Sequence, residues 1–171
     1  EAFVKDGSLI AIAEMIKSGT TTFNDMYFYP NQTAEAAVEM GIRANIGLVV
    51  MEFPTNYASD PDDYLKKGLD FRDQWRGDGL ISTSLAPHAP YTTSDKTLNT
   101  IGTYADQLNM TIHTHLHETK EEVENSINQY KATPIQRYKS LGLLGPNLMA
   151  AHCTHVDESD LNLLHQNNVN V

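Results

Sequence analysis

Residues Thr111 to Glu118 read TIHTHLHE, a stretch that contains three of the chain's seven histidines. Read as a β-strand, it places His113, His115 and His117 on one face, because successive side chains of a strand point to opposite faces. Glu118 then lies at the end of the strand, where a loop begins. Imidazole and carboxylate groups in this arrangement can form a metal site or a proton-transfer site. The alternative is a basic patch on an edge strand, or one buried histidine with two solvated neighbours.

Further strands and helices alternate on both sides of this stretch. Runs of β-branched, aromatic and apolar residues predict strands, and apolar residues three and four positions apart predict helices. The predicted strands are residues 20–27, 42–50, 80–86, 110–118 and 148–152, and residues 168–171 look like the start of another. A helix is expected after each strand, and one more helix precedes the first.

Capping residues predict where the helices begin and end. The first helix is expected to begin near Asp6 or Ser8 and to end at Gly19, and the second to cover residues 33–40, with Pro30 ending the strand before it. The later helices are predicted to start at capping side chains. These N-caps are Asp60, Ser94, Thr133 and Asp157.

The composition describes an acidic globular protein and excludes several classes of partner. The 171 residues are 40% apolar and 20% charged, which suits one packed domain. Nucleic acid and anionic membrane surfaces would repel a net charge of −10. No apolar run approaches the roughly 20 residues that cross a bilayer, and no signal peptide is recognisable. Because Cys153 is the single cysteine, no internal disulfide can form, and a cytoplasmic protein acting on a small molecule is expected.

Strict alternation of strands and helices predicts an α/β fold with a parallel sheet and right-handed crossovers. A doubly wound open sheet suits 171 residues, whereas a (β/α)8 barrel takes about 250. The polar residues favour the barrel, because its strand ends converge on one face. Polar side chains lie at or just past the ends of four predicted strands: Asn24 and Asp25 of the first, then His88, His115 and His152. We therefore expect a partial (β/α)8 TIM barrel, about strands 2 to 7 of a longer one.

Four motifs carry a family resemblance: GTTTFNDMYF (Gly19 to Phe28), APHAPY (Ala86 to Tyr91), HTHLHET (His113 to Thr119) and AAHCTH (Ala150 to His155). In this order and spacing the chain resembles the metal-dependent amidohydrolase superfamily over essentially its whole length. It is most similar to the 5-methylthioadenosine/S-adenosylhomocysteine deaminases and their triazine-hydrolase relatives. The resemblance implies an aminohydrolase that deaminates an adenine-like or related N-heterocycle with metal-activated water. Since relatives on one scaffold act on different heterocycles, a chlorohydrolase and a guanine or cytosine deaminase stay open as alternatives.

The resemblance also implies a role for four residues. His115 corresponds to a metal-binding histidine, and Glu118 to the glutamate that moves protons and contacts the substrate. A neutral imidazole is a good metal ligand, and a nearby carboxylate can pass a proton from water to a ring nitrogen. His152 would hold and polarise the attacking water, and His88 would bind the substrate. The implied cofactor is one divalent metal, Zn²⁺ by ligand type, although Fe²⁺ and Ni²⁺ accept the same ligands.

The remaining histidines match no functional position of the family. His113 is expected to have a structural role, with a hydrogen bond to a neighbour. His117 and His155 are expected at the rim or behind the ligands, and His165 on the surface. Cys153 is expected to pack as a small apolar residue in its strand rather than to act as a nucleophile. Asp25, which can equally bond the loop after it, is left out of the site.

Parts of the family pattern find no match in the chain. The His-x-His pair of the first strand and the aspartate of the eighth are missing, so residues 1–171 are expected to be one incomplete catalytic barrel domain that binds Zn²⁺ poorly alone. The family's substrate-carboxylate arginines have no match between Gly47 and Asp70, which argues against S-adenosylhomocysteine as substrate. Unpaired strand edges would favour association into homo-oligomers. The competing hypothesis is a non-catalytic α/β binding module, complete at this length.

Overall fold

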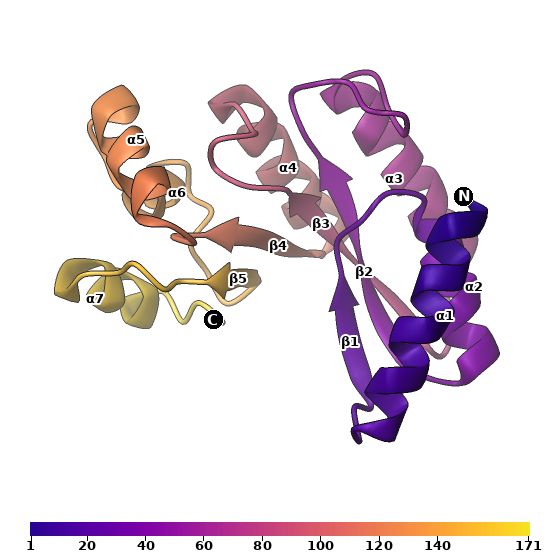
Figure 1. The fold of residues 1–171 in the computed structure, drawn as a ribbon. Helices are drawn as coiled ribbons and strands as arrows, with labels where there is room; N and C mark the ends of the chain where they lie inside the picture. Colours follow the sequence, from indigo (N-terminus) through magenta and orange to yellow (C-terminus); the bar gives the residue numbers. More distant parts are fainter. The chain divides into compact units, whose positions relative to one another are not determined.

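The computed structural model describes residues 1–171, in which helices and strands alternate along the chain (Figure 1). The strands are β1 (Thr22–Asp25), β2 (Arg43–Val50), β3 (Ile81–Pro87), β4 (Thr111–Leu116) and β5 (Leu148–His152). The helices are α1 (Ala2–Lys17), α2 (Pro30–Met40), α3 (Pro61–Trp75), α4 (Asp95–Leu108), α5 (Lys120–Tyr130), α6 (Pro134–Ser140) and α7 (Glu158–Gln166). None of these helices has both the length and the apolar character that crossing a bilayer requires. The chain divides into two compact units, residues 1–49 with 53–84, and residues 50–52 with 85–171.

The strands form hydrogen bonds in the order β1-β2-β3-β4-β5, which is also their order along the chain. β1 pairs in parallel with β2, Thr22 lying opposite Arg43, and β4 pairs in parallel with β5, His115 lying opposite Ala151. Every crossover therefore advances the sheet in one direction, as in a (β/α)8 barrel, whereas a doubly wound sheet reverses its order at a switch point. The predicted fold class, α/β and part of a (β/α)8 barrel, is confirmed.

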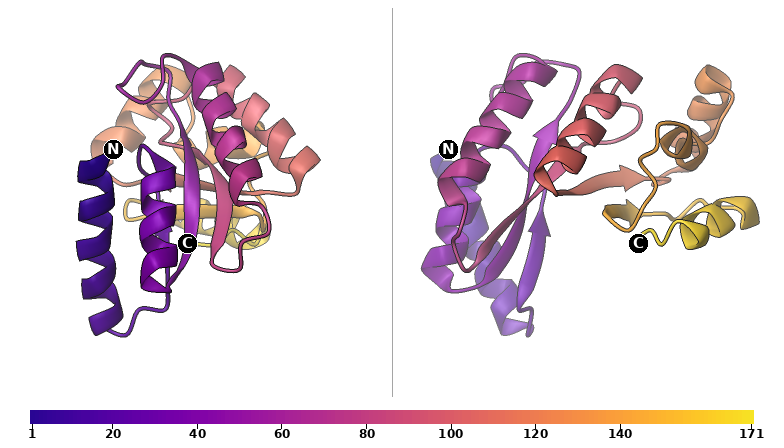
Figure 2. Two further views of the ribbon diagram at one scale, coloured as in Figure 1. Left: turned by 90° about the vertical axis from the view of Figure 1, so that its right-hand side faces the viewer. Right: turned by 180° about the vertical axis from the view of Figure 1, so that it is seen from behind.

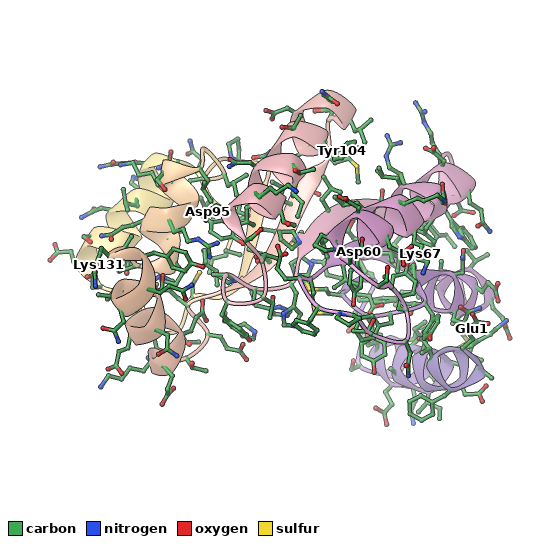
Figure 3. The ribbon with its side chains drawn as sticks, turned by 90° about the horizontal axis from the view of Figure 1, so that it is seen from above. Glu1, Asp60, Lys67, Asp95, Tyr104 and Lys131 are labelled. Atoms are coloured by element: carbon green, nitrogen blue, oxygen red, sulfur yellow. The ribbon has the colours of Figure 1, made fainter.

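The first unit packs α1, α2 and α3 with the strands β1 and β2. α1 and α2 lie side by side (Figure 2, left). α3 approaches β2 closely at Gly68, where a Cβ atom would lie 3.0 Å from the Cβ of Leu48. Asp60, labelled in Figure 3, caps this helix, because its carboxylate accepts a hydrogen bond from the Asp63 N–H. The core contains the buried side chains of Ile12, Ala37, Ile46, Leu48, Tyr64 and Phe71.

The second unit contains β4 and β5 and the helices α4 to α7. The predicted apolar stripe of α4 is buried at Leu98, Ile101 and Ala105, and this helix begins at Asp95, labelled in Figure 3. The core also contains the side chains of Ile112, Leu116, Ile135 and Leu148. This unit contains all four residues predicted for the active site.

Several predicted boundaries are confirmed and others are wrong. The side chains of Asp60, Ser94, Thr133 and Asp157 all cap helices as predicted. α1 begins at Ala2 and not near Asp6 or Ser8, since nothing in the residues before Asp6 interrupts a helix. α2 begins at Pro30, so the prediction that Pro30 ends the preceding strand and that the helix starts at Thr33 is wrong. Proline is favourable at the first helical position because a backbone N–H would have no partner within the helix there. Residues 168–171 add a single parallel bridge between Met149 and Asn170.

Candidate active site

The second unit brings the four predicted site residues together at the carboxyl ends of three strands. His88 follows β3, His115 lies on β4, Glu118 follows β4 by two positions, and His152 is the last residue of β5. The ring centroid of His115 lies 5.0 Å from that of His88 and 5.4 Å from that of His152. The Nε2 atom of His152 lies 3.7 Å from Oε1 of Glu118. The roles of these residues stay predictions, but their proximity is a property of the fold.

The tautomer of His115 follows from its hydrogen bonds. Its Nδ1 atom lies 2.6 Å from the carbonyl oxygen of His88, and its backbone N–H donates to the same oxygen at 3.1 Å. Because a carbonyl oxygen only accepts, Nδ1 carries a hydrogen, and in the neutral ring Nε2 then has a lone pair. A histidine oriented by an Nδ1–H bond to a carbonyl is the usual arrangement of a metal ligand. His115 therefore fits its predicted role.

His88 is held by the loop that follows it. Its Nδ1 atom lies 3.0 Å from the hydroxyl oxygen of Thr92, which donates its own hydrogen to the carbonyl of Ala89. The Nδ1–H of His88 thus donates to Thr92, and Nε2 is left as an acceptor. Burial, together with the neighbouring His115, lowers the pKa of His88 below its ordinary value, which favours the neutral ring. The ring of Tyr91 packs edge-on against that of His88, with the two ring centroids 6.3 Å apart.

Glu118 and His152 are the more open part of the site, with side chains 42% and 38% exposed. The ring of His152 stacks on that of His115 at an interplanar angle of 23°. His152 has a backbone φ of 78° and Cys153 a φ of 48°, a left-handed conformation that costs free energy in residues other than glycine. Such strain is concentrated at functional sites in many proteins, where the surrounding structure enforces it.

The prediction that His117 shares a face with His113 and His115 is wrong. β4 ends at Leu116, and His117 has a φ of 53°, which turns its side chain out of the strand alternation. Its ring is fully buried: Nδ1 donates to the carbonyl of His155 at 2.8 Å, and Nε2 accepts from the Ile135 N–H at 3.2 Å. The residue is therefore a structural connection between β4, α6 and the loop after β5.

The remaining sequence candidates have structural positions. His113 is buried, but its Nδ1 atom has no hydrogen-bond partner, so the predicted bond is missing at that nitrogen. His165 is exposed on α7, as expected. Cys153 lies just after β5 and not within it, and burial raises the pKa of its thiol to about 11, which argues against a nucleophile. Asp25 ends β1 in the other unit, where burial raises the pKa of its carboxyl.

Sequence reasoning missed residues that support the site from behind. The carboxylate oxygens of Glu122 accept the backbone N–H groups of His117 and Glu118 at 2.9 and 2.8 Å. The pattern of Thr119 followed three residues later by a glutamate is a capping-box signature and could have drawn attention to Glu122. Arg137, buried on α6, donates to the carbonyls of Pro90 and Thr93 in the loop after His88. No sequence pattern distinguishes this arginine from one on the surface.

This chain supplies part of a possible metal site, with His115 as a candidate ligand. Within residues 1–171 no group of three or more His, Cys, Asp or Glu side chains is arranged to hold a metal ion. The free Nε2 of His115, with Nδ1 anchored, nevertheless fits a ligand of Zn²⁺, Fe²⁺ or Ni²⁺. The donor set of this chain is therefore compatible with a metal and incomplete.

Known proteins match the chain over nearly its whole length. Residues 1–171 match the sequence profile of the Amidohydrolase family. The 5-methylthioadenosine/S-adenosylhomocysteine deaminase of Saccharophagus degradans is 48% identical over 164 residues, which are 96% of this chain and 37% of that protein. The zinc-bound crystal structure of an adenosine deaminase from Xanthomonas campestris is 43% identical, with a TM-score of 0.95 over 98% of this chain and 38% of that chain.

A more distant structural match is a protein whose name states a different reaction. The zinc complex of atrazine chlorohydrolase from Arthrobacter aurescens is 19% identical, with a TM-score of 0.87 over 96% of this chain and 41% of that chain. At this identity the likeness bears on the fold alone. The chain spans only 37% to 41% of the length of these three proteins.

Proposed function

The chain belongs to the amidohydrolase family, and we propose that its site serves a metal-dependent deamination of an adenine-like heterocycle. The observation that carries the proposal is the convergence of His115, Glu118 and His152 at the ends of β4 and β5. A ligand imidazole, a carboxylate and a second imidazole can together serve the metal-assisted hydrolysis of a carbon–nitrogen bond. The names of the relatives at 48% and 43% identity support the same reaction class.

The proposed cofactor is one divalent metal, with His115 as one of its ligands through Nε2. Zn²⁺ is favoured because imidazole suits it and because the 43% identical structure from X. campestris contains zinc. When bound, such an ion supplies a water of lowered pKa and withdraws electrons from the reacting centre. The remaining ligands would come from outside residues 1–171, which form part of one catalytic barrel domain in this proposal.

Glu118 is the proposed proton carrier. Its carboxylate accepts the proton that the attacking water loses, and donates it to the ring nitrogen beside the amino-bearing carbon. The new carbon–oxygen bond makes this carbon tetrahedral. Release of ammonia, after the amino group gains the second proton of the water, then leaves the carbonyl product. A side chain that is 42% exposed can reach both water and a bound heterocycle.

His152 and His88 are proposed to orient the two reactants. His152 has its Nε2 atom 3.7 Å from the Glu118 carboxylate, so a water bonded to one of them lies near the other. His88, neutral and with Nε2 as an acceptor, would bind a donor group of the substrate. The ring of His88 is held by the Thr92 hydroxyl, and that of His152 stacks on His115.

The favoured substrate is an uncharged adenine nucleoside such as 5′-methylthioadenosine. The name of the S. degradans relative includes this nucleoside and S-adenosylhomocysteine. The latter carries an amino-acid carboxylate, and the segment from Gly47 to Asp70 has no arginine to pair with it. We propose a cytoplasmic enzyme with a small heterocyclic substrate, supported by the acidic charge and the single cysteine.

The test is an ammonia-release assay on the full-length protein loaded with Zn²⁺. We expect turnover of 5′-methylthioadenosine or adenosine, and a loss of about 10²-fold or more in kcat in Glu118→Gln, because a general acid–base group contributes that much. Glu121→Gln is the matched control, since Glu121 is exposed three positions away, and it should keep full activity. Metal-loaded protein that releases no ammonia from nucleosides, guanine, cytosine or triazines would contradict the proposal.

A further inference from the structure

We propose that Glu122 and Thr154 are positioning residues that fix the place of the Glu118 carboxylate, an inference that rests on the proposed role of Glu118. Both residues act through the backbone and not on the reacting groups. Glu122, on α5, accepts the backbone N–H of Glu118. Thr154, in the loop after β5, donates to the backbone carbonyl of Glu118.

Glu118 needs such support because little else restrains it. It lies two positions beyond the end of β4, after a left-handed residue, His117, whose φ is 53°. Its side chain is 42% exposed, and its Oε1 atom is 3.7 Å from Nε2 of His152, beyond hydrogen-bonding distance. The position of the carboxylate must therefore be set largely by the backbone that carries it.

Glu122 binds that backbone from the side of α5. The residue is only 6% exposed, although carboxylates are rarely buried without partners. One of its oxygens accepts the His117 N–H at 2.9 Å and the other accepts the Glu118 N–H at 2.8 Å. Hydrogen bonds to a carboxylate are stronger than those between neutral groups, and two of them on consecutive N–H groups fix the orientation of both peptides.

Thr154 binds the same segment from the side of β5. Its hydroxyl donates to the Glu118 carbonyl at 2.7 Å and lies 3.2 Å from the His117 carbonyl, and its N–H donates to the His117 carbonyl at 3.0 Å. Thr154 follows His152 by two positions, so these bonds connect the backbone of the proton carrier with that of the water-binding histidine. The distance between Glu118 and His152 is a consequence of this connection.

Thr154 offers the sharper test because it is exposed, and its substitution should leave the fold intact. In the metal-loaded full-length protein, Thr154→Val removes the hydroxyl at constant shape, and Thr154→Ser retains it. We expect Thr154→Val to lower kcat for ammonia release at least about tenfold with KM changed less than about threefold, since small misplacements of catalytic groups cost up to about 10²-fold. Thr154→Ser should restore kcat to within about threefold of wild type, which a purely shape-based role would not predict.

Glu122→Gln tests the other side of the peptide. One amide oxygen can still accept one N–H, but the amide NH₂ would face the second, so kcat should fall while the metal content stays that of wild type. Glu121→Gln, its exposed neighbour on α5, should change nothing. An active wild type whose Thr154→Val and Glu122→Gln variants keep kcat, or a Thr154→Ser variant as impaired as Thr154→Val, would overturn the positioning role alone. A wild type without deaminase activity would overturn the proposed function, and the inference with it.

Discussion

The three histidines of the Thr111 to Glu118 stretch have different chemical environments, set by the backbone at each position. His115 has one ring nitrogen bonded to a carbonyl and the other free, so it can act as a ligand. His117 uses both ring nitrogens within the protein, so it has no lone pair to offer. The same residue type therefore becomes a functional candidate or a structural one, according to what its two nitrogens meet.

A second residue-level property is the weak acidity of the Cys153 thiol. Burial, with smaller contributions from the nearby carboxylates of Glu122 and Asp160, raises its pKa to about 11. The folded-state pKa exceeds the unfolded value of about 8.5, so this group favours folding below pH 8.5 and loses that contribution as the pH rises through about 11. We expect alkylation of Cys153, followed by peptide mass spectrometry, to be slow at pH 8 and to accelerate towards pH 11. In urea the same thiol should react with a midpoint near pH 8.5, and a similar midpoint in the folded protein would contradict the prediction.

At the scale of elements, α6 positions the loop that carries His88. Arg137 is 3% exposed, and its guanidinium donates to the Pro90 and Thr93 carbonyls and to the Asp95 carboxylate at the start of α4. It also lies over the ring of Tyr130, 4.1 Å from the centroid. A rigid planar fork can satisfy these acceptors together, which a lysine cannot.

Arg137→Met should therefore destabilise the protein by about 3–5 kcal/mol, because it leaves buried acceptors without donors. Arg137→Lys should recover only part of this loss. Lys139→Met, an exposed change on the same helix, is the control and should leave the midpoint of thermal unfolding unchanged. Equal melting temperatures for Arg137→Met and Lys139→Met would show that these contacts do not stabilise the loop.

At the scale of the whole molecule, the strand order follows from patterns that the sequence makes visible. Alternating strands and helices predict parallel crossovers, and capping side chains such as Asp60 and Ser94 predict helix starts, because both depend on nearby residues. The roles of His115 and Glu118 follow from the resemblance of their motif to that of a known family, and they stay predictions. The turn at His117 could not be predicted, since a left-handed φ in a histidine depends on its distant partners His155 and Ile135. The burial of Glu122 depends on tertiary packing in the same way.

We propose that Nε2 of His115 holds the metal of this amidohydrolase site. The most direct measurement is the anomalous diffraction of zinc in crystals of the full-length, Zn²⁺-loaded protein. We predict a peak within bonding distance of His115 Nε2, which is lost in His115→Ala but not in the exposed control His165→Ala. A strong zinc peak elsewhere, with none beside His115, would contradict it.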